Sequence, residues 1–318
     1  HNINLILVIK TTRAPRNKNK GGILRIMGIE NFILNQVIFI GIFIILATGL
    51  NIALGYTGLL NFGHAAFYGI GAYTSALLAV NLGIPFLFSL IVAGIIAGIF
   101  GILLAFPTLK LRGDYLALAT IGFGIIIENI LKNWRSLTRG PLGIPGIPKP
   151  SIFGFEFSSL FTYAILVYII VIILLIIAYR IVNSPFGRVL KAVRDDELAA
   201  STLGKNVFKY KTTALAISAF FAGIAGSLYA HYITYIDPTA FNILQSILIV
   251  SIIVVGGLAS IKGTIIGAII ITLLPEPLRF LHIPGFIVGA IRQILYSLLL
   301  IIILLKKPQG ILGENVIR

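Results

Sequence analysis

Long runs of apolar residues alternate with short polar stretches along most of the chain. The runs are continuous and rich in Leu and Ile, which favours helices over the alternating strands of a β-barrel. Backbone polar groups in lipid must pair within the segment, and about 20 apolar residues form a helix that crosses a bilayer. The sequence therefore predicts an all-α polytopic membrane helical bundle. Its candidate spans are residues 31–53, 56–80, 86–106, 114–131, 160–180, 211–232, 242–261, 263–281 and 285–305.

The basic residues between the runs indicate an orientation, because short cytoplasmic loops carry an excess of Lys and Arg. We take the basic segment 1–30 as cytoplasmic. If residues 56–80 made a full crossing, the charged loop 181–210 and the tail 306–318 would lie outside. If they make no net crossing, both lie inside, which fits the charges better. We therefore predict about eight full crossings, an even number, within a membrane domain of residues 31–305.

Glycine recurs between residues 55 and 73, where the polar residues Asn61 and His64 interrupt an apolar run. Irregular backbone at membrane depth is tolerated only where it is buried in protein or lines a cavity. We therefore interpret residues 56–80 as a broken or re-entrant segment. The alternative is an ordinary helix whose small residues allow close packing.

The charged loop 181–210 contains the signals of two short helices. Such a hairpin is either an amphipathic element at the membrane surface or a docking element for a cytoplasmic protein, and the residues alone leave both open. The signals are a capping hydroxyl and a proline at Ser184 and Pro185, an apolar face of Phe186, Leu190 and Val193, acidic residues 195–197, and a terminating Gly204.

Composition narrows the function classes. Only 11% of the 318 residues are charged and mean hydropathy is +1.03, against about 25% charged residues in soluble domains. The net charge of +15 lies in short loops without a nucleic-acid-binding motif, so we expect no nucleic-acid partner. Cysteine is absent, and no nucleotide-binding loop, hydrolase motif or metal-ligand spacing occurs. We therefore expect no metal, no cofactor in this chain and no enzymatic activity.

Four ionisable residues lie near predicted span ends: Glu128, Glu276, Arg279 and Arg292. Ionisable residues within a membrane are functional candidates, although side chains near span ends can also extend to the interface. They are too few and too scattered for a proton relay.

Six stretches of the chain, in this order, have a pattern in common with one family: residues 51–67, 111–120, 184–197, 220–230, 256–260 and 308–313. They resemble the permease subunits of branched-chain amino-acid ABC transporters, of the LivM type. The resemblance implies a multi-pass subunit of the bacterial inner membrane, surrounded by lipid. It also implies three kinds of protein partner: a second homologous permease subunit, ABC ATPase subunits that bind ATP, and a substrate-binding protein.

The resemblance implies transport of branched-chain or related amino acids. Urea or short amides are an alternative, since a similar permease family handles them, and an ion-coupled secondary carrier is disfavoured. The loop 184–204 resembles the coupling segment of the family, and Val193→Asp is expected to abolish ATPase association. The residues expected to contact the ATPases are Pro185, Phe186, Gly187, Arg188, Leu190, Lys191, Ala192, Val193 and Arg194. Those expected along the translocation path are Gly55, Tyr56, Asn61 and His64.

Overall fold

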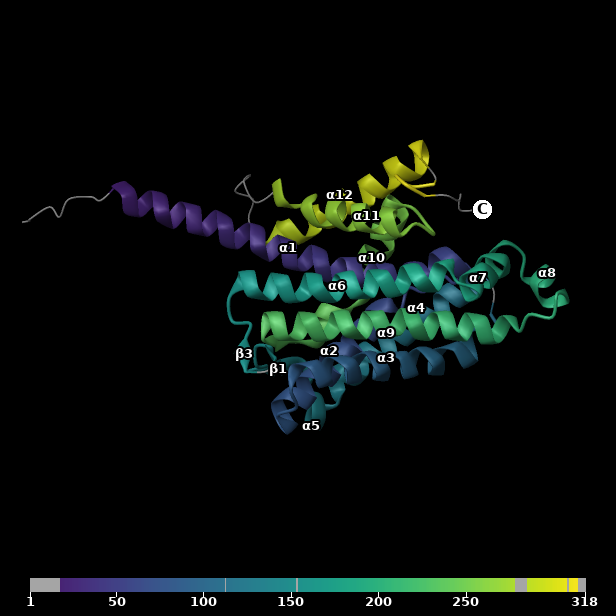
Figure 1. The fold of residues 1–318 in the computed structure, drawn as a ribbon, viewed down its shortest axis with the longest axis horizontal. Coiled ribbons are helices and arrows are strands. Elements are labelled where there is room, and N and C mark those ends of the chain that lie inside the picture. Colours follow the sequence, from purple (N-terminus) through teal and green to yellow (C-terminus); the bar gives the residue numbers. More distant parts are fainter. Residues whose placement is uncertain (1–17, 112, 153, 278–284, 308, 314–318) are drawn as a thin grey trace, which may run out of the picture.

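The computed structural model describes residues 18–111, 113–152, 154–277, 285–307 and 309–313, and within these it is a bundle of helices (Figure 1). The long helices are α1 (Lys18–Thr57), α2 (His64–Leu82), α3 (Phe86–Thr108), α4 (Asp114–Asn133), α6 (Leu160–Asn183) and α9 (Val207–Ile233). Shorter ones are α5 (Arg135–Thr138), α7 (Pro185–Asp195), α8 (Glu197–Thr202), α10 (Ile243–Gly256) and α11 (Ile261–Leu273), followed by α12 (Gly285–Lys306).

Six of the described helices, α1, α2, α3, α4, α6 and α9, are long and apolar enough to cross a membrane. Helices α10, α11 and α12 add shorter apolar stretches. Together these nine helices match the nine apolar segments of the sequence, so the predicted all-α membrane bundle is confirmed.

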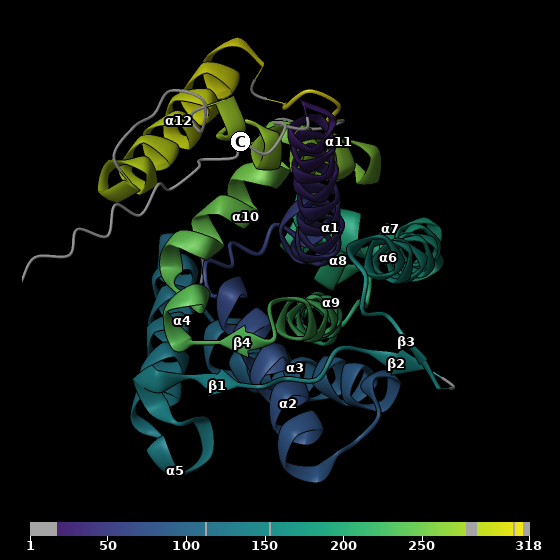
Figure 2. The same ribbon diagram turned by 90° about the vertical axis from the view of Figure 1, so that its left-hand side faces the viewer.

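Helix α9 is the centre of the bundle, with α1 on one side and α2 and α3 on the other (Figure 2). Small residues let the backbones approach closely, as is common between membrane helices. A Cβ atom added to Gly223 of α9 would lie 2.5 Å from the carbonyl oxygen of Ala93 in α3. One added to Gly226 would lie 2.2 Å from the carbonyl oxygen of Tyr68 in α2.

The outer faces of α3 and α6 are apolar. Phe88 and Leu103 of α3 are 65% and 54% exposed, and Phe161 and Ile172 of α6 are 61% and 55% exposed. Exposed apolar surface of this extent is unfavourable in water and indicates lipid as the solvent.

The remaining elements are short and belong to the connections. Strand β1 (Ile144–Pro145) pairs antiparallel with β4 (Tyr235–Ile236), with Ile144 opposite Ile236. Strand β2 (Ser151–Ile152) pairs antiparallel with β3 (Phe155–Glu156). The 3-10 helices are η1 (Gly140–Leu142) and η2 (Pro238–Phe241).

Helices α1 and α9 run antiparallel, and this defines the two ends of the bundle. Tyr232, at the end of α9, donates a hydrogen bond to Asn35 in the N-terminal half of α1. At the other end of α1, the carbonyl of Gly55 accepts a hydrogen bond from Arg194 of α7. The described start of α1 therefore lies at the end of the bundle opposite to α7 and α8 (Figure 1). The predicted orientation, which placed the start of the chain on the same side as loop 181–210, is wrong here; residues 1–17 lie outside the described residues.

The predicted orientation is wrong because of the path that the Gly-rich segment takes after α1. Residues 58–63 are not helical, so the predicted break is confirmed. His64, the first residue of α2, has its Nε2 atom 3.1 Å from the carbonyl oxygen of Leu46, about three turns before the end of α1. The break thus returns the chain along α1, and α2 continues unbroken to Leu82. The break and α2 together bring the chain back along the bundle toward the end where α1 starts. The charge argument had instead assumed that residues 56–80 make no net crossing.

Candidate functional site

Helices α7 and α8 form the hairpin that the sequence predicted. The side chain of Ser184 accepts a hydrogen bond from the backbone N–H of Gly187 at 3.3 Å, and Pro185 follows at the first helical position. The side chain of Asp196 caps α8 by accepting from the N–H of Ala199 at 3.0 Å. Gly204 ends the hairpin with φ of +75°, a conformation that glycine adopts without steric penalty.

The apolar face of α7 is turned toward the bundle. Leu190 and Val193 are buried, and the ring of Phe186 stacks on Tyr210 of α9 with 5.5 Å between centroids. Gly187 is also buried, and a Cβ atom there would lie 2.1 Å from the carbonyl oxygen of Val182. The predicted docking role of Val193 therefore needs correction: an aspartate there would disturb the packing of α7 on the bundle before it changed any external surface.

The outer face of the hairpin consists of other residues. Arg188 and Ala192 of α7 are exposed, as is Pro185 at its start. Leu198 and Leu203, on and just after α8, are 65% and 76% exposed, so two apolar side chains lie on the outer face of the hairpin. Helix α8 projects beyond the other helices at this end of the bundle (Figure 1).

Two basic residues connect α7 to the segment that precedes the break. The Nη1 atom of Arg194 donates to the carbonyl oxygen of Gly55 at 2.9 Å. The Nζ atom of Lys191 lies 5.6 Å from the centroid of the Tyr56 ring, within the range of a cation–π interaction. The structure thus brings together residues predicted for coupling and residues predicted for the path, although sequence patterns gave no indication of this contact.

The polar side chains of the break are buried inside the bundle. Asn61 accepts a hydrogen bond from the backbone N–H of Gly63 at 2.9 Å, which stabilises the turn into α2. Asn61 Nδ2 and His64 Nδ1 have no hydrogen-bond partner among the described residues. Gly55 and Tyr56 are buried as well. None of the four is among the residues that line the cavities of about 860 and 540 Å³, and their place on a translocation path stays a prediction.

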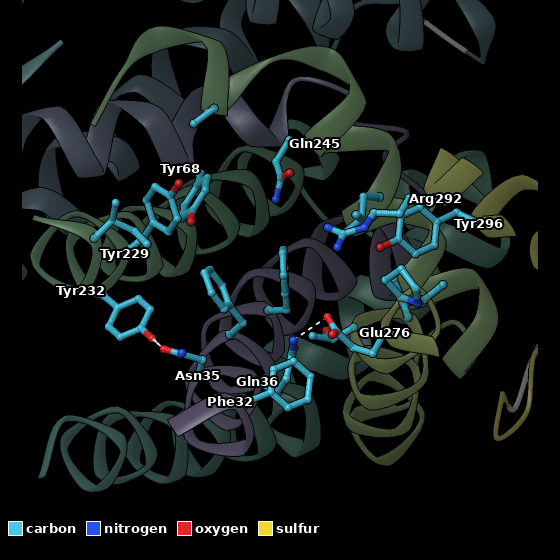
Figure 3. A pocket seen from close by; sticks show the side chains of 18 of the residues that line it. Phe32, Asn35, Gln36, Tyr68, Tyr229, Tyr232, Gln245, Glu276, Arg292 and Tyr296 are labelled. Carbon is cyan, nitrogen blue, oxygen red and sulfur yellow. Dashed lines mark hydrogen bonds between the residues drawn. The ribbon is translucent and has the colours of Figure 1, made fainter. Parts of the chain in front are cut away.

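A cavity of about 860 Å³ lies at the opposite end of the bundle, between α1, α9, α10, α12 and the residues after α11 (Figure 3). One side of it is polar. There the amide of Gln36 donates a hydrogen bond to the carboxylate of Glu276, and Arg292 lies beside Tyr296 (Figure 3). The other side carries the hydroxylated rings of Tyr68, Tyr229 and Tyr232.

The sequence had singled out two of the cavity residues, Glu276 and Arg292, because they are ionisable and lie in apolar segments. The tyrosines carried no signal, since they come from helices far apart in the sequence. Arg279, the third such residue in this region, lies outside the described residues, and Glu128 forms an i,i+4 ion pair with Lys132 at 2.6 Å.

A helical bundle with apolar outer faces, a broken segment inside it and a polar cavity between helices has the architecture of a membrane transport protein. The chain belongs to the family described as the permease component of branched-chain amino acid transport systems, whose model matches residues 32–304. It is a multi-pass protein of the inner membrane.

Curated relatives agree with this assignment. The chain is 37% identical to the high-affinity branched-chain amino acid transport permease LivM of Escherichia coli, over 85% of this chain and 68% of the relative. It is 26% identical to a LivM permease of Methanocaldococcus jannaschii, over 88% and 92% of the two chains. It is also 27% identical to the LivH permease of Salmonella typhimurium, over 85% and 91%. No solved structure matches the chain.

Proposed function

We propose that the chain is a permease subunit of an ATP-driven ABC importer and translocates branched-chain amino acids that a substrate-binding protein delivers. The family membership and the names of the relatives support the substrate class. The observation that carries the ATP-driven mechanism is the α7–α8 hairpin, whose inner face is fixed to the bundle while its outer face is exposed. ATP would be bound and hydrolysed by partner subunits, so the chain itself performs no covalent chemistry.

The contacts of the hairpin suggest how movement would reach the bundle. ATPase subunits that close on ATP would displace α7 and α8 as one body. Arg194 holds the carbonyl of Gly55, and Lys191 lies over Tyr56, so these contacts would transmit a shift of α7 to the end of α1. The break at residues 58–63 follows directly. Its non-helical backbone can change shape at less cost than a continuous helix, and it would convert the displacement into alternating access.

One face of the bundle differs from the lipid-facing helices and supports pairing with a second, homologous permease subunit. Gln293 and Ser297 of α12 are exposed. Polar side chains facing lipid are costly, whereas polar residues between membrane helices form interhelical hydrogen bonds. We propose that the second permease subunit covers this side of α12.

The outer face of the hairpin gives a direct test. The double variant Leu198→Asp with Leu203→Asp alters two leucines that contribute little to the packed interior. The assay is co-purification of the ATPases with the permease pair, followed by ATP hydrolysis with leucine-loaded binding protein. The control is Leu142→Asp, an exposed leucine (79%) in the connections at the other end of the bundle.

The proposal predicts that the double variant loses the ATPases while the control retains them. Retention of the ATPases by a folded double variant would contradict the proposed docking face. An intact complex whose ATP hydrolysis does not respond to leucine-loaded binding protein would contradict the substrate class.

A further inference from the structure

We infer that the cavity between α1, α9, α10 and α12 is a transit site that binds the amino acid as a zwitterion. Glu276 would hold the ammonium group, Arg292 the carboxylate, and the tyrosine side the aliphatic chain. The inference rests on the proposed function and names the place where this chain meets its substrate.

The first support is the pair of opposite charges. Glu276 and Arg292 come from different elements and face the same cavity, yet they form no ion pair with each other. Ionisable side chains within a membrane protein are unfavourable unless partners or water compensate them. A zwitterion supplies both opposite charges at once, at the short separation of an α-amino acid.

The geometry around each charge fits its proposed role. The hydrogen bond from Gln36 occupies one oxygen of Glu276 and orients the carboxylate, which leaves further acceptor positions for an ammonium group. The planar guanidinium of Arg292 can bind a carboxylate through two parallel hydrogen bonds. Gln245 lies on the wall between this polar side and the tyrosines (Figure 3). There its amide can accept a hydrogen bond from the ammonium group of the ligand or donate one to its carboxylate.

The second support is the aromatic side. Tyr68 and Tyr229 lie with their ring centroids 5.4 Å apart, and Phe39 meets Tyr232 edge to face at 5.5 Å. These rings pack on one another and form an aromatic wall, against which a branched aliphatic side chain can pack. Urea and short amides have no such side chain and carry neither an ammonium nor a carboxylate group, so the cavity favours an amino acid over them.

The size and position of the cavity suit transit rather than tight storage. Its volume of about 860 Å³ lies within the range of roughly 300–1,000 Å³ of small-molecule sites and leaves room for water beside one amino acid. It lies at the end opposite to α7 and α8. If the hairpin faces the cytoplasm, this is the outer end, where a binding protein would release its ligand.

The absence of cysteine from the chain permits a direct measurement. In Ala240→Cys, the new thiol is the only one in the chain and lies at the cavity wall. The permease–ATPase complex in nanodiscs, with the other subunits made cysteine-free, is labelled with a maleimide while leucine is titrated. Leu142→Cys, exposed and outside the cavity, is the matched control.

Leucine should slow the labelling of Ala240→Cys and leave that of Leu142→Cys unchanged. At equal concentrations, 4-methylpentanoate lacks the ammonium group and 3-methylbutylamine lacks the carboxylate, so both should protect far less. Labelling that leucine does not slow, or that both analogues slow equally well, would overturn the inference.

The two charges are tested by Glu276→Gln and Arg292→Gln on the Ala240→Cys background. Each should raise the leucine concentration needed for half protection roughly tenfold to a hundredfold, the loss expected for a hydrogen-bonded charged contact. Unchanged protection in both variants would refute the assigned roles. The parent complex is assayed separately for ATP-driven leucine uptake. Uptake without protection contradicts this inference alone, whereas absence of uptake contradicts the proposed function.

Discussion

The contact between α2 and α9 allows one stability prediction to be worked out from the structure. A Cβ atom added to Gly71 of α2 would lie 2.3 Å from both the Cα and the carbonyl oxygen of Gly223 in α9. Carbon atoms in favourable contact lie about 3.5–4.0 Å apart. The obstructing atoms belong to backbone, which cannot rotate away, so Gly71→Ala would force the two helices apart by more than an ångström.

The expected magnitude follows from two opposing terms. Overpacking of a tight core costs about 1–3 kcal/mol, and a backbone clash belongs at the upper end of that range. The gain in helix propensity from Gly to Ala offsets at most about 1 kcal/mol. Gly71→Ala should therefore lower the free energy of unfolding by roughly 1–2 kcal/mol.

Gly122→Ala is the matched control. It makes the same chemical change within helix α4, where an added Cβ atom would meet nothing within 4 Å. Only the propensity term remains, so this variant should be as stable as the parent or more stable by up to about 1 kcal/mol. The assay is denaturant titration in detergent, followed by far-UV circular dichroism. Equal stability of Gly71→Ala and the parent would refute the close packing of α2 on α9.

Three further predictions concern single polar contacts. Asn51 is buried and forms hydrogen bonds to the backbone of Ala259 and Ser260 and to the hydroxyl of Thr264. Asn51→Leu should therefore lower the free energy of unfolding by about 1–3 kcal/mol. A denaturation curve like that of the parent would contradict this. Arg194→Gln breaks the hydrogen bond to Gly55, so leucine uptake should fall while ATP hydrolysis stays intact. An equal loss of both activities would contradict this coupling role and indicate failed assembly. The His231 ring forms hydrogen bonds to Ser75 at 3.0 Å and to the carbonyl of Pro148 at 2.7 Å. His231→Ala should therefore release the connection around Pro148 and make proteolysis of that connection faster. An unchanged cleavage rate would contradict this anchoring role.

The elements of the fold follow from local patterns and could be predicted. The apolar runs predicted the nine helices that are long or apolar enough to lie in the membrane. Ser184 and Pro185 predicted the start of α7, because capping depends on adjacent residues alone. The break after Thr57 was also predictable, since glycine and polar residues interrupt an apolar run there.

The arrangement of these elements depends on contacts between distant residues, and here prediction failed. The apolar stripe of Leu190 and Val193 indicated that one face of α7 would be covered, but not that the bundle itself covers it. The predicted orientation failed because the non-helical residues 58–63 turn the chain back along α1, where His64 contacts Leu46, and loop charges do not report this turn. The cavity could not be predicted, because α1, α9, α10 and α12 meet only in the folded bundle.

The most direct test of the central claim is uptake of labelled leucine into proteoliposomes. They would hold this chain with its partner permease and ATPases, and the binding protein would be added outside. The proposed function predicts uptake that requires ATP, the binding protein and this chain together, and that ceases when Leu198 and Leu203 of the hairpin are both changed to Asp. Leucine uptake by this chain with no ATPase present would contradict it.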